Sequence, residues 1–190
     1  MYKTAFSLLA SCLLLVACDD TTLGTKSFQE TLDPISIPGA PVSLGLLTLP
    51  ELSFPLDLKD QEGYELLGNV TAVHARSATF SISADSDSPE LDQFADNNPD
   101  NFDFIASIVL SLRATLNGTR QTIKVASLPE GDPQIGSNAS ELSLVVEDVD
   151  IRDYVEAPDV NLVVLVTGTV PQDFVVIDTD LRFRVSLGIR

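Results

Sequence analysis

A strict period of two over residues 102–116 constrains the fold of this chain more than any other feature. The even positions of this stretch are all apolar, whereas most of the odd positions are polar. Successive side chains of a strand point to opposite faces, so the pattern predicts a strand whose even face is buried. Asn117-Gly118 follows, and a two-residue type I′ turn favours such a pair because both residues must adopt positive φ. We therefore predict a β-hairpin whose second strand covers Thr119–Leu128.

Two further strands are predicted near the C-terminus. Residues 160–170 are apolar on both faces near the middle, which predicts a central strand, and residues 175–190 alternate strictly. Weaker strands are predicted over 28–32, 35–37, 42–49, 52–58, 73–83 and 142–149, and single helical turns over 61–67 and 151–155. Prolines interrupt the earliest of these strands, which favours positions at the edges of a sheet.

About eight strands joined by turns, with no helix of ordinary length, predict an all-β chain. The expected fold is an antiparallel β-sandwich, immunoglobulin-like in a loose sense, and a small β-barrel is the alternative. The spacing of two cysteines around a tryptophan that marks true immunoglobulin domains is absent, since the chain contains no tryptophan.

The N-terminus carries the features of an export signal. Lys3 precedes an apolar run from Ala5 to Ala17, which is too short to span a bilayer but suits the core of a signal peptide. The run ends in Leu15-Val16-Ala17-Cys18, which resembles the lipobox of bacterial lipoproteins. The resemblance implies that a diacylglycerol is attached to Cys18 and that cleavage occurs before it. We predict a signal peptide over 1–17, a lipidated cysteine and tether over 18–27, and one β-sandwich domain over 28–190.

Lipidation at Cys18 would place the protein in the bacterial cell envelope, anchored to a membrane outside the cytoplasm by its acyl chains. Asp19 and Asp20 resemble a signal for retention in the inner membrane, but they fit the start of a solvated tether equally well, so inner and outer membrane both stay open. Cys12 lies in the segment that cleavage would remove, so no disulfide is expected in the mature domain.

The formal net charge is −17, with 28 acidic and 11 basic side chains. A surface of this charge repels phosphate backbones, so nucleic acid is not an expected partner. Residues 77–112 contain no basic side chain, and within them Asp96, Asn98 and Asp100 have the spacing of the first three calcium ligands of an EF-hand. The match then fails, because the sixth position is Asn101 and the twelfth is Ser107. We favour a solvated acidic loop and keep calcium as the alternative.

Candidate catalytic groups are few. His74 is the only histidine, and its place in an alternating strand favours a structural side chain at the surface or half-buried. The acids Glu147, Asp148, Asp150 and Asp153 could supply the carboxylate pair of a glycoside hydrolase, but in so acidic a chain such clusters arise by chance.

The sequence therefore favours a non-enzymatic binding or structural module without a cofactor. Its expected partners are the membrane, through the lipid, and another envelope protein or a glycan. A calcium-dependent carbohydrate- or protein-binding module is the alternative, and an acidic hydrolase is less favoured.

Overall fold

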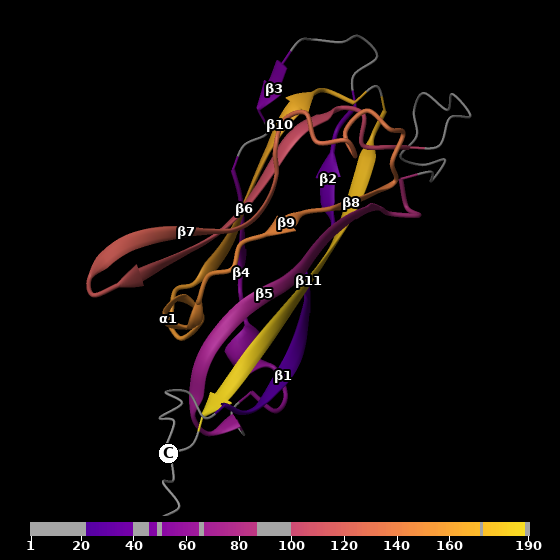
Figure 1. Cartoon of the computed structure of the whole chain (residues 1–190). Helices are drawn as coiled ribbons and strands as arrows, with labels where there is room; N and C mark the ends of the chain where they lie inside the picture. Colours follow the sequence, from indigo (N-terminus) through magenta and orange to yellow (C-terminus); the bar gives the residue numbers. More distant parts are fainter. Residues whose placement is uncertain are drawn as a thin grey trace, which may run out of the picture.

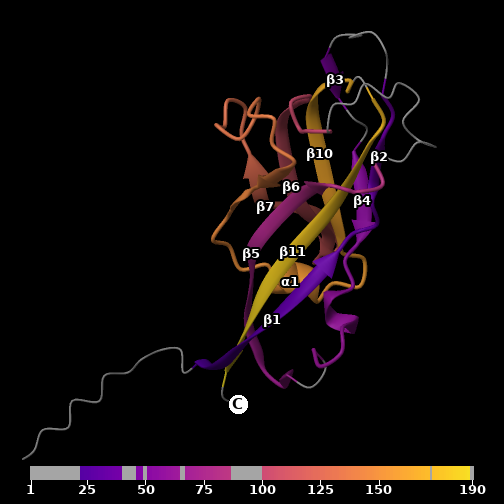
Figure 2. The same ribbon diagram turned by 90° about the vertical axis from the view of Figure 1, so that its right-hand side faces the viewer.

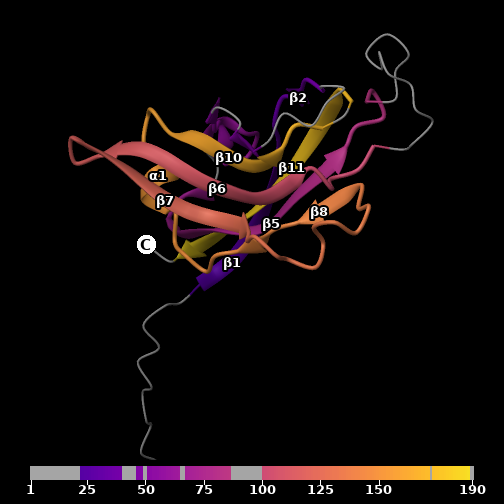
Figure 3. The same ribbon diagram turned by 90° about the horizontal axis from the view of Figure 1, so that it is seen from above.

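A computed structural model describes residues 22–39, 46–48, 51–64, 67–86, 100–171 and 173–188. In these residues the chain forms eleven strands, the short helix α1 (Arg152–Val155) and one 3-10 turn, η1 (Leu58–Asp60). The strands form two antiparallel sheets that lie in separate layers (Figure 1, Figure 3). The predicted β-sandwich is confirmed. The alternative of a small barrel is wrong, because no ladder joins the two sheets in the described part of the chain.

The five-stranded sheet is built around the C-terminal strand, β11 (Val175–Gly188). On one side β11 pairs with β1 (Thr22–Thr31) and β2 (Ile35–Ile37). On the other side it pairs with β5 (Val70–Ile82), which in turn pairs with β8 (Glu141–Ser143). The alternation predicted for this strand is observed from Ile177 to Val185, where inward residues such as Phe183 are buried between polar outward ones, whereas Val176 is buried as well.

The six-stranded sheet is built around β10 (Asn161–Thr169), so the central position predicted for this strand is confirmed. One side of β10 pairs with β3 (Leu46–Thr48) and β4 (Leu52–Pro55). The other side pairs with β6 (Ile105–Leu116), which is followed in the sheet by β7 (Thr119–Leu128) and β9 (Val145–Val146).

The four strands nearest the N-terminus, β1 to β4, lie at sheet edges, as the prolines predicted: in the described residues each pairs with one strand only. The single strand predicted over 142–149 is wrong. Leu144 donates its N–H to Ala78 of β5, 2.9 Å away, whereas Glu147 donates to Val125 of β7, also at 2.9 Å. This segment therefore crosses from one sheet to the other, and β8 and β9 belong to different layers.

Apolar side chains from both sheets fill the space between the layers. Each contributes about 1.5–3 kcal/mol when it is fully buried. The largest fully buried side chains are Phe80, Phe102, Phe183, Ile37, Leu56, Leu58, Ile105, Ile108, Leu110, Leu112, Leu128 and Leu142.

The turn between β6 and β7 confirms the predicted hairpin. Asn117 and Gly118 have φ values of 52° and 77°, both in the left-handed region that a type I′ turn requires. Leu116 and Thr119 face each other across this turn. The hairpin end projects from the side of the sandwich (Figure 1).

The start of the predicted strand over 102–116 is wrong in one respect. The even positions from Ile108 to Ala114 are buried as expected, but the odd residue Ile105 is also buried, and Phe104 is only half-buried. The cause is a bulge in the ladder with β10, in which Thr167 faces Ser107 and Gly168 faces Ile105. The extra residue, Ala106, shifts the alternation by one position, so the inward set changes parity there.

The helical turns are partly as predicted. The turn over 151–155 is confirmed as α1. The turn predicted over 61–67 is preceded by η1, and hydrogen bonds of the same i to i+3 type continue from Leu58 to Leu67.

The two ends of the sandwich are distinguished by the register of β11. Thr22, where β1 begins, pairs with Gly188, whereas Ile82 at the end of β5 pairs with Ile177. At a rise of about 3.3 Å per residue, the 14 residues of β11 separate these ends by roughly 40 Å. The strand β1 begins inside the segment predicted as a tether. Its first residues are mostly polar and have no hydropathy pattern typical of a strand, and they form one because they pair with β11.

Candidate functional site

Most residues of the predicted sites lie outside the described residues: this is so for Cys18, Asp96 and Asn98. Asp100 is described and half-buried. The described residues contain no group of three or more histidine, cysteine, aspartate or glutamate side chains that could hold a metal ion. In the same residues no helix is long and apolar enough to cross a membrane. Lipidation at Cys18 and calcium binding by the acidic loop therefore stay predictions.

Hydrogen bonds hold the described residues on both sides of the acidic loop that was predicted around Asp96. At its start the buried hydroxyl of Ser86 bonds the backbone of Val176. At its end the carboxylate of Asp103 accepts the N–H of Asn138 at 2.9 Å, and Phe102 donates its N–H to the carbonyl of Ala139 at 2.8 Å. The carboxylate of Asp103 thus holds the backbone at Asn138.

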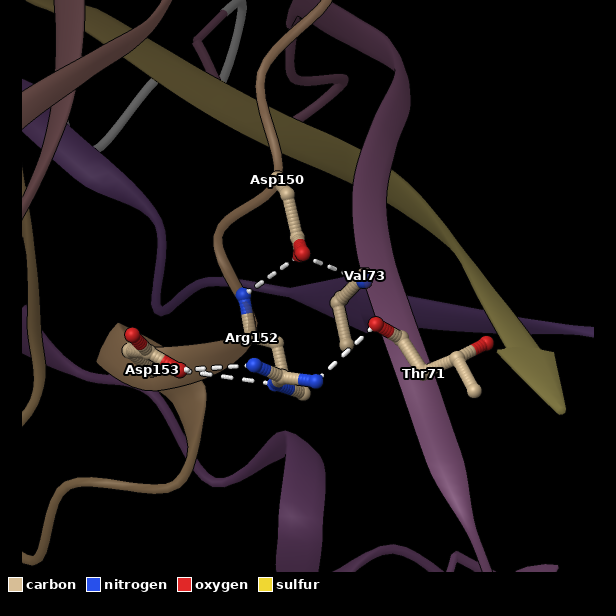
Figure 4. Close-up of polar contacts among 5 residues, drawn as sticks. All are labelled: Thr71, Val73, Asp150, Arg152 and Asp153. Atoms are coloured by element: carbon tan, nitrogen blue, oxygen red, sulfur yellow. Dashed lines mark hydrogen bonds and ion pairs between the residues drawn. The ribbon is translucent and has the colours of Figure 1, made fainter. Parts of the chain in front are cut away.

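The acids at 147–153 are separately engaged. Asp150 Oδ1 accepts the N–H groups of Val73 and Arg152 at 2.9 and 3.0 Å, and Arg152 Nη1 donates to the carbonyl of Thr71 at 3.0 Å (Figure 4). The guanidinium of Arg152 also contacts Asp153, at 3.3 Å. These bonds hold α1 against β5.

The remaining two acids of this cluster lie apart from that network. Glu147 pairs with Lys124 of β7 at 2.5 Å, whereas the side chain of Asp148 is almost fully exposed. Three of the four predicted acids, Glu147, Asp150 and Asp153, thus have structural partners of their own.

His74 lies on the outer face of β5, half-buried as predicted, with 22% of its side chain exposed. Its Nε2 is 4.0 Å from Asp148, and its Nδ1 is buried without a hydrogen-bond partner. The residue directly opposite on β11 is Arg184, whose Nε is also buried without a partner. Side chains at such opposite positions have Cβ atoms about 4.5–5.5 Å apart and lie side by side.

Two more arginines share this outer face. Arg182 lies two residues before Arg184 on β11 and faces Ser77 of β5. Arg76 is the extra residue of a bulge, because Phe183 faces Ala75 while Arg182 faces Ser77. A bulge changes the direction of a side chain, and Arg76 is exposed here. We call His74, Arg76, Arg182 and Arg184 the basic face. In Figure 2 the strands β1, β5 and β11, which carry this face or border it, lie in front of the six-stranded sheet.

Two members of the basic face, Arg76 and Arg184, differ from the other described arginines in having no carboxylate partner. Arg113, Arg120 and Arg152 each pair with a carboxylate, and Arg182 lies 3.6 Å from Asp180. Arg113 binds Glu51 through both of its terminal nitrogens, which holds the pKa of Glu51 below its usual value. Among the arginines that the structure describes, only Arg76 and Arg184 form no ion pair with a described carboxylate.

This arrangement was missed by sequence reasoning, which placed Arg182 and Arg184 on the polar face of the last strand and treated His74 by itself. The available signal was that two strands each carry basic or histidine side chains two residues apart, His74 with Arg76 and Arg182 with Arg184. The pairing of β5 with β11, which brings them together, is visible only in the structure.

Comparison with known proteins identifies no relative of this chain. No protein family and no curated protein matches it. A solved structure that it resembles weakly is "Cryo-EM structure of giant freshwater prawn Macrobrachium rosenbergii nodavirus (MrNV) semi-empty VLP". The identity is 8% and the TM-score is 0.29, over 100% of this chain and 94% of that one.

Proposed function

We propose that this protein is a lipid-anchored, non-enzymatic β-sandwich of the bacterial cell envelope, which presents a binding surface to another envelope protein or a glycan. The proposal combines the lipobox at Cys18 with one observation of the fold. The described domain begins at Thr22, four residues after that cysteine, and Thr22 lies at one end of the sandwich beside Gly188. A lipid on Cys18 would therefore hold one end of the domain close to the membrane.

The opposite end would then face away from the membrane. It carries the turns at 83–86 and 129–140, which lie toward the top of Figure 1, near β8. Loops at one end of a rigid sandwich can vary in sequence without loss of the core, so they are suitable for contacts with a partner.

The two cysteines of the chain provide a matched test of the anchor. The full chain is expressed in bacteria that are fed a labelled fatty acid, as wild type, Cys18→Ser and Cys12→Ser. We expect wild type and Cys12→Ser to carry the label and to sediment with membranes. Cys18→Ser should lose the label, since it lacks the thiol that would accept the lipid.

The mass of the mature N-terminus gives a second readout, because acylation and cleavage at Cys18 together set that mass. Label and mass that remain as in wild type after Cys18→Ser would contradict the proposal. Loss of label in Cys12→Ser would also contradict it, because that cysteine lies in the segment expected to be removed.

A further inference from the structure

We propose that the basic face binds a phosphate group, which is held by Arg76, Arg184 and His74. The first argument is electrostatic. In a chain with 28 acidic and 11 basic side chains, a carboxylate partner is available to most cations. Arg76 and Arg184 nevertheless have none among the described carboxylates, although they lie on neighbouring strands.

The second argument concerns hydrogen-bond donors. Buried polar atoms of folded proteins almost always have a partner, and an unsatisfied one costs about 1–3 kcal/mol. On this face His74 Nδ1 and Arg184 Nε are both buried and unpartnered, and the two residues face each other across the β5–β11 ladder. When both side chains turn outward toward a ligand that accepts hydrogen bonds, each of these atoms gains a partner.

The third argument identifies the ligand class. Guanidinium groups bind carboxylates and phosphates through planar pairs of N–H bonds. Two guanidiniums and an imidazole offer more donors than the two oxygens of one carboxylate can accept, whereas a phosphate group has additional oxygens. Of the nearby acids, Asp180 lies 3.6 Å from Arg182 and accepts a hydrogen bond from Gln29, and the exposed Asp148 lies 4.0 Å from His74 Nε2, so neither forms an ion pair with Arg76 or Arg184.

Two sources carry such a phosphate group: a lipid headgroup and a soluble phosphate ester. Arg184 lies four residues before Gly188, roughly 13 Å from the end of the domain where β1 begins. This position suits a headgroup if the domain is anchored, but phosphate binding itself does not depend on the lipid at Cys18.

The only histidine of the chain provides a direct readout, because its imidazole gives a unique set of NMR resonances. The full chain, without a histidine tag, is held in micelles of a neutral detergent at constant pH and ionic strength. It is titrated with glycerol 3-phosphate, with phosphatidylglycerol added to the micelles, and with chloride as the reference anion.

A saturable shift of the His74 resonances with glycerol 3-phosphate supports a site for soluble phosphate esters. A saturable shift with phosphatidylglycerol alone supports a site for lipid headgroups. We expect Arg76→Gln combined with Arg184→Gln to lower the affinity for whichever ligand gives the saturable shift at least tenfold.

The matched control removes two positive charges elsewhere, by Arg120→Gln combined with Lys124→Gln on β7, and should leave binding unchanged. Circular dichroism and thermal melting confirm that both double variants are folded. The proposal is overturned if neither ligand shifts the resonances, if chloride reproduces the shift, or if both double variants bind equally well. The readout does not use acylation, so a negative result here and a failure of the anchor at Cys18 are separate outcomes.

Discussion

The hydroxyl of Ser86 bonds both backbone groups of Val176: its oxygen accepts the N–H at 2.7 Å, and its O–H donates to the carbonyl at 3.1 Å. Val176 lies in β11 opposite Ser36 of β2, and its other side is beyond the last ladder residue of β5, Ile82. A side chain thus continues the hydrogen bonding of the ladder where the neighbouring strand has ended. Ser86 is 2% exposed, so both bonds are shielded from water.

We expect Ser86→Ala to lower the free energy of unfolding by about 1–3 kcal/mol, because the buried N–H of Val176 would lose its partner, whereas the carbonyl of Val176 keeps the N–H of Ser83 at 2.8 Å. Ser83→Ala is the control in the same turn, since the Ser83 hydroxyl only accepts a long bond of 3.4 Å from Asp85 in an exposed position. Urea unfolding measured by circular dichroism compares the two variants. Equal stability of both would show that the Ser86 bonds do not stabilise the fold.

Leu110→Ala should lower the free energy of unfolding by about 2–5 kcal/mol, since Leu110 is fully buried between the sheets. Ser111→Ala changes the next residue of β6, which lies half-buried on the opposite face, and should cost little. Denaturant unfolding of both variants measures the difference. A similar cost at the two positions would contradict the assignment of the buried face.

Gly168→Ala and Gly118→Ala should destabilise the protein for different reasons. At Gly168 a Cβ would lie 2.1 Å from the backbone oxygen of Phe104, so the bulged strands must separate, at a cost of about 3 kcal/mol. At Gly118 the space is open, and the cost of about 1–2 kcal/mol arises from a φ of 77°. Thermal melting should therefore rank Gly168→Ala as the less stable variant, and the reverse order would contradict this geometry.

Glu30→Gln and Glu51→Gln should have opposite effects on stability at pH 7. Burial is the main cause that raises the pKa of Glu30 above 4.5, so its charged form destabilises the folded state at neutral pH. The hydrogen bonds from Arg113 lower the pKa of Glu51, so its charged form stabilises the folded state. We expect Glu30→Gln to raise the melting temperature and Glu51→Gln to lower it.

Both effects should fade in acid. Below pH 4.5 wild-type Glu30 is protonated in the folded and unfolded states, so the advantage of Glu30→Gln disappears. The contribution of Glu51 is present above pH 4.5 and is lost as the pH falls through its lower folded-state pKa. Melting curves from pH 7 to pH 3 test this, and a difference that does not change with pH would contradict the electrostatic cause.

The sequence by itself determined the features that depend on neighbouring residues. The alternation over 102–116 and 175–190 identified the two main strands, because side chains of a strand point to opposite faces. Asn117-Gly118 identified the hairpin because both residues adopt positive φ. Prolines identified the edge strands, since a residue without an N–H cannot donate within a ladder.

Only the tertiary structure decided which strands pair and where their register shifts. The bulge at Ala106 and the crossing of residues 141–146 between the sheets depend on partners that are distant in sequence. The same holds for the basic face, because His74 and Arg184 become neighbours only through the β5–β11 ladder. Alternation along one strand specifies which side chains face outward, but the neighbours across the sheet are selected by the packing of the whole core.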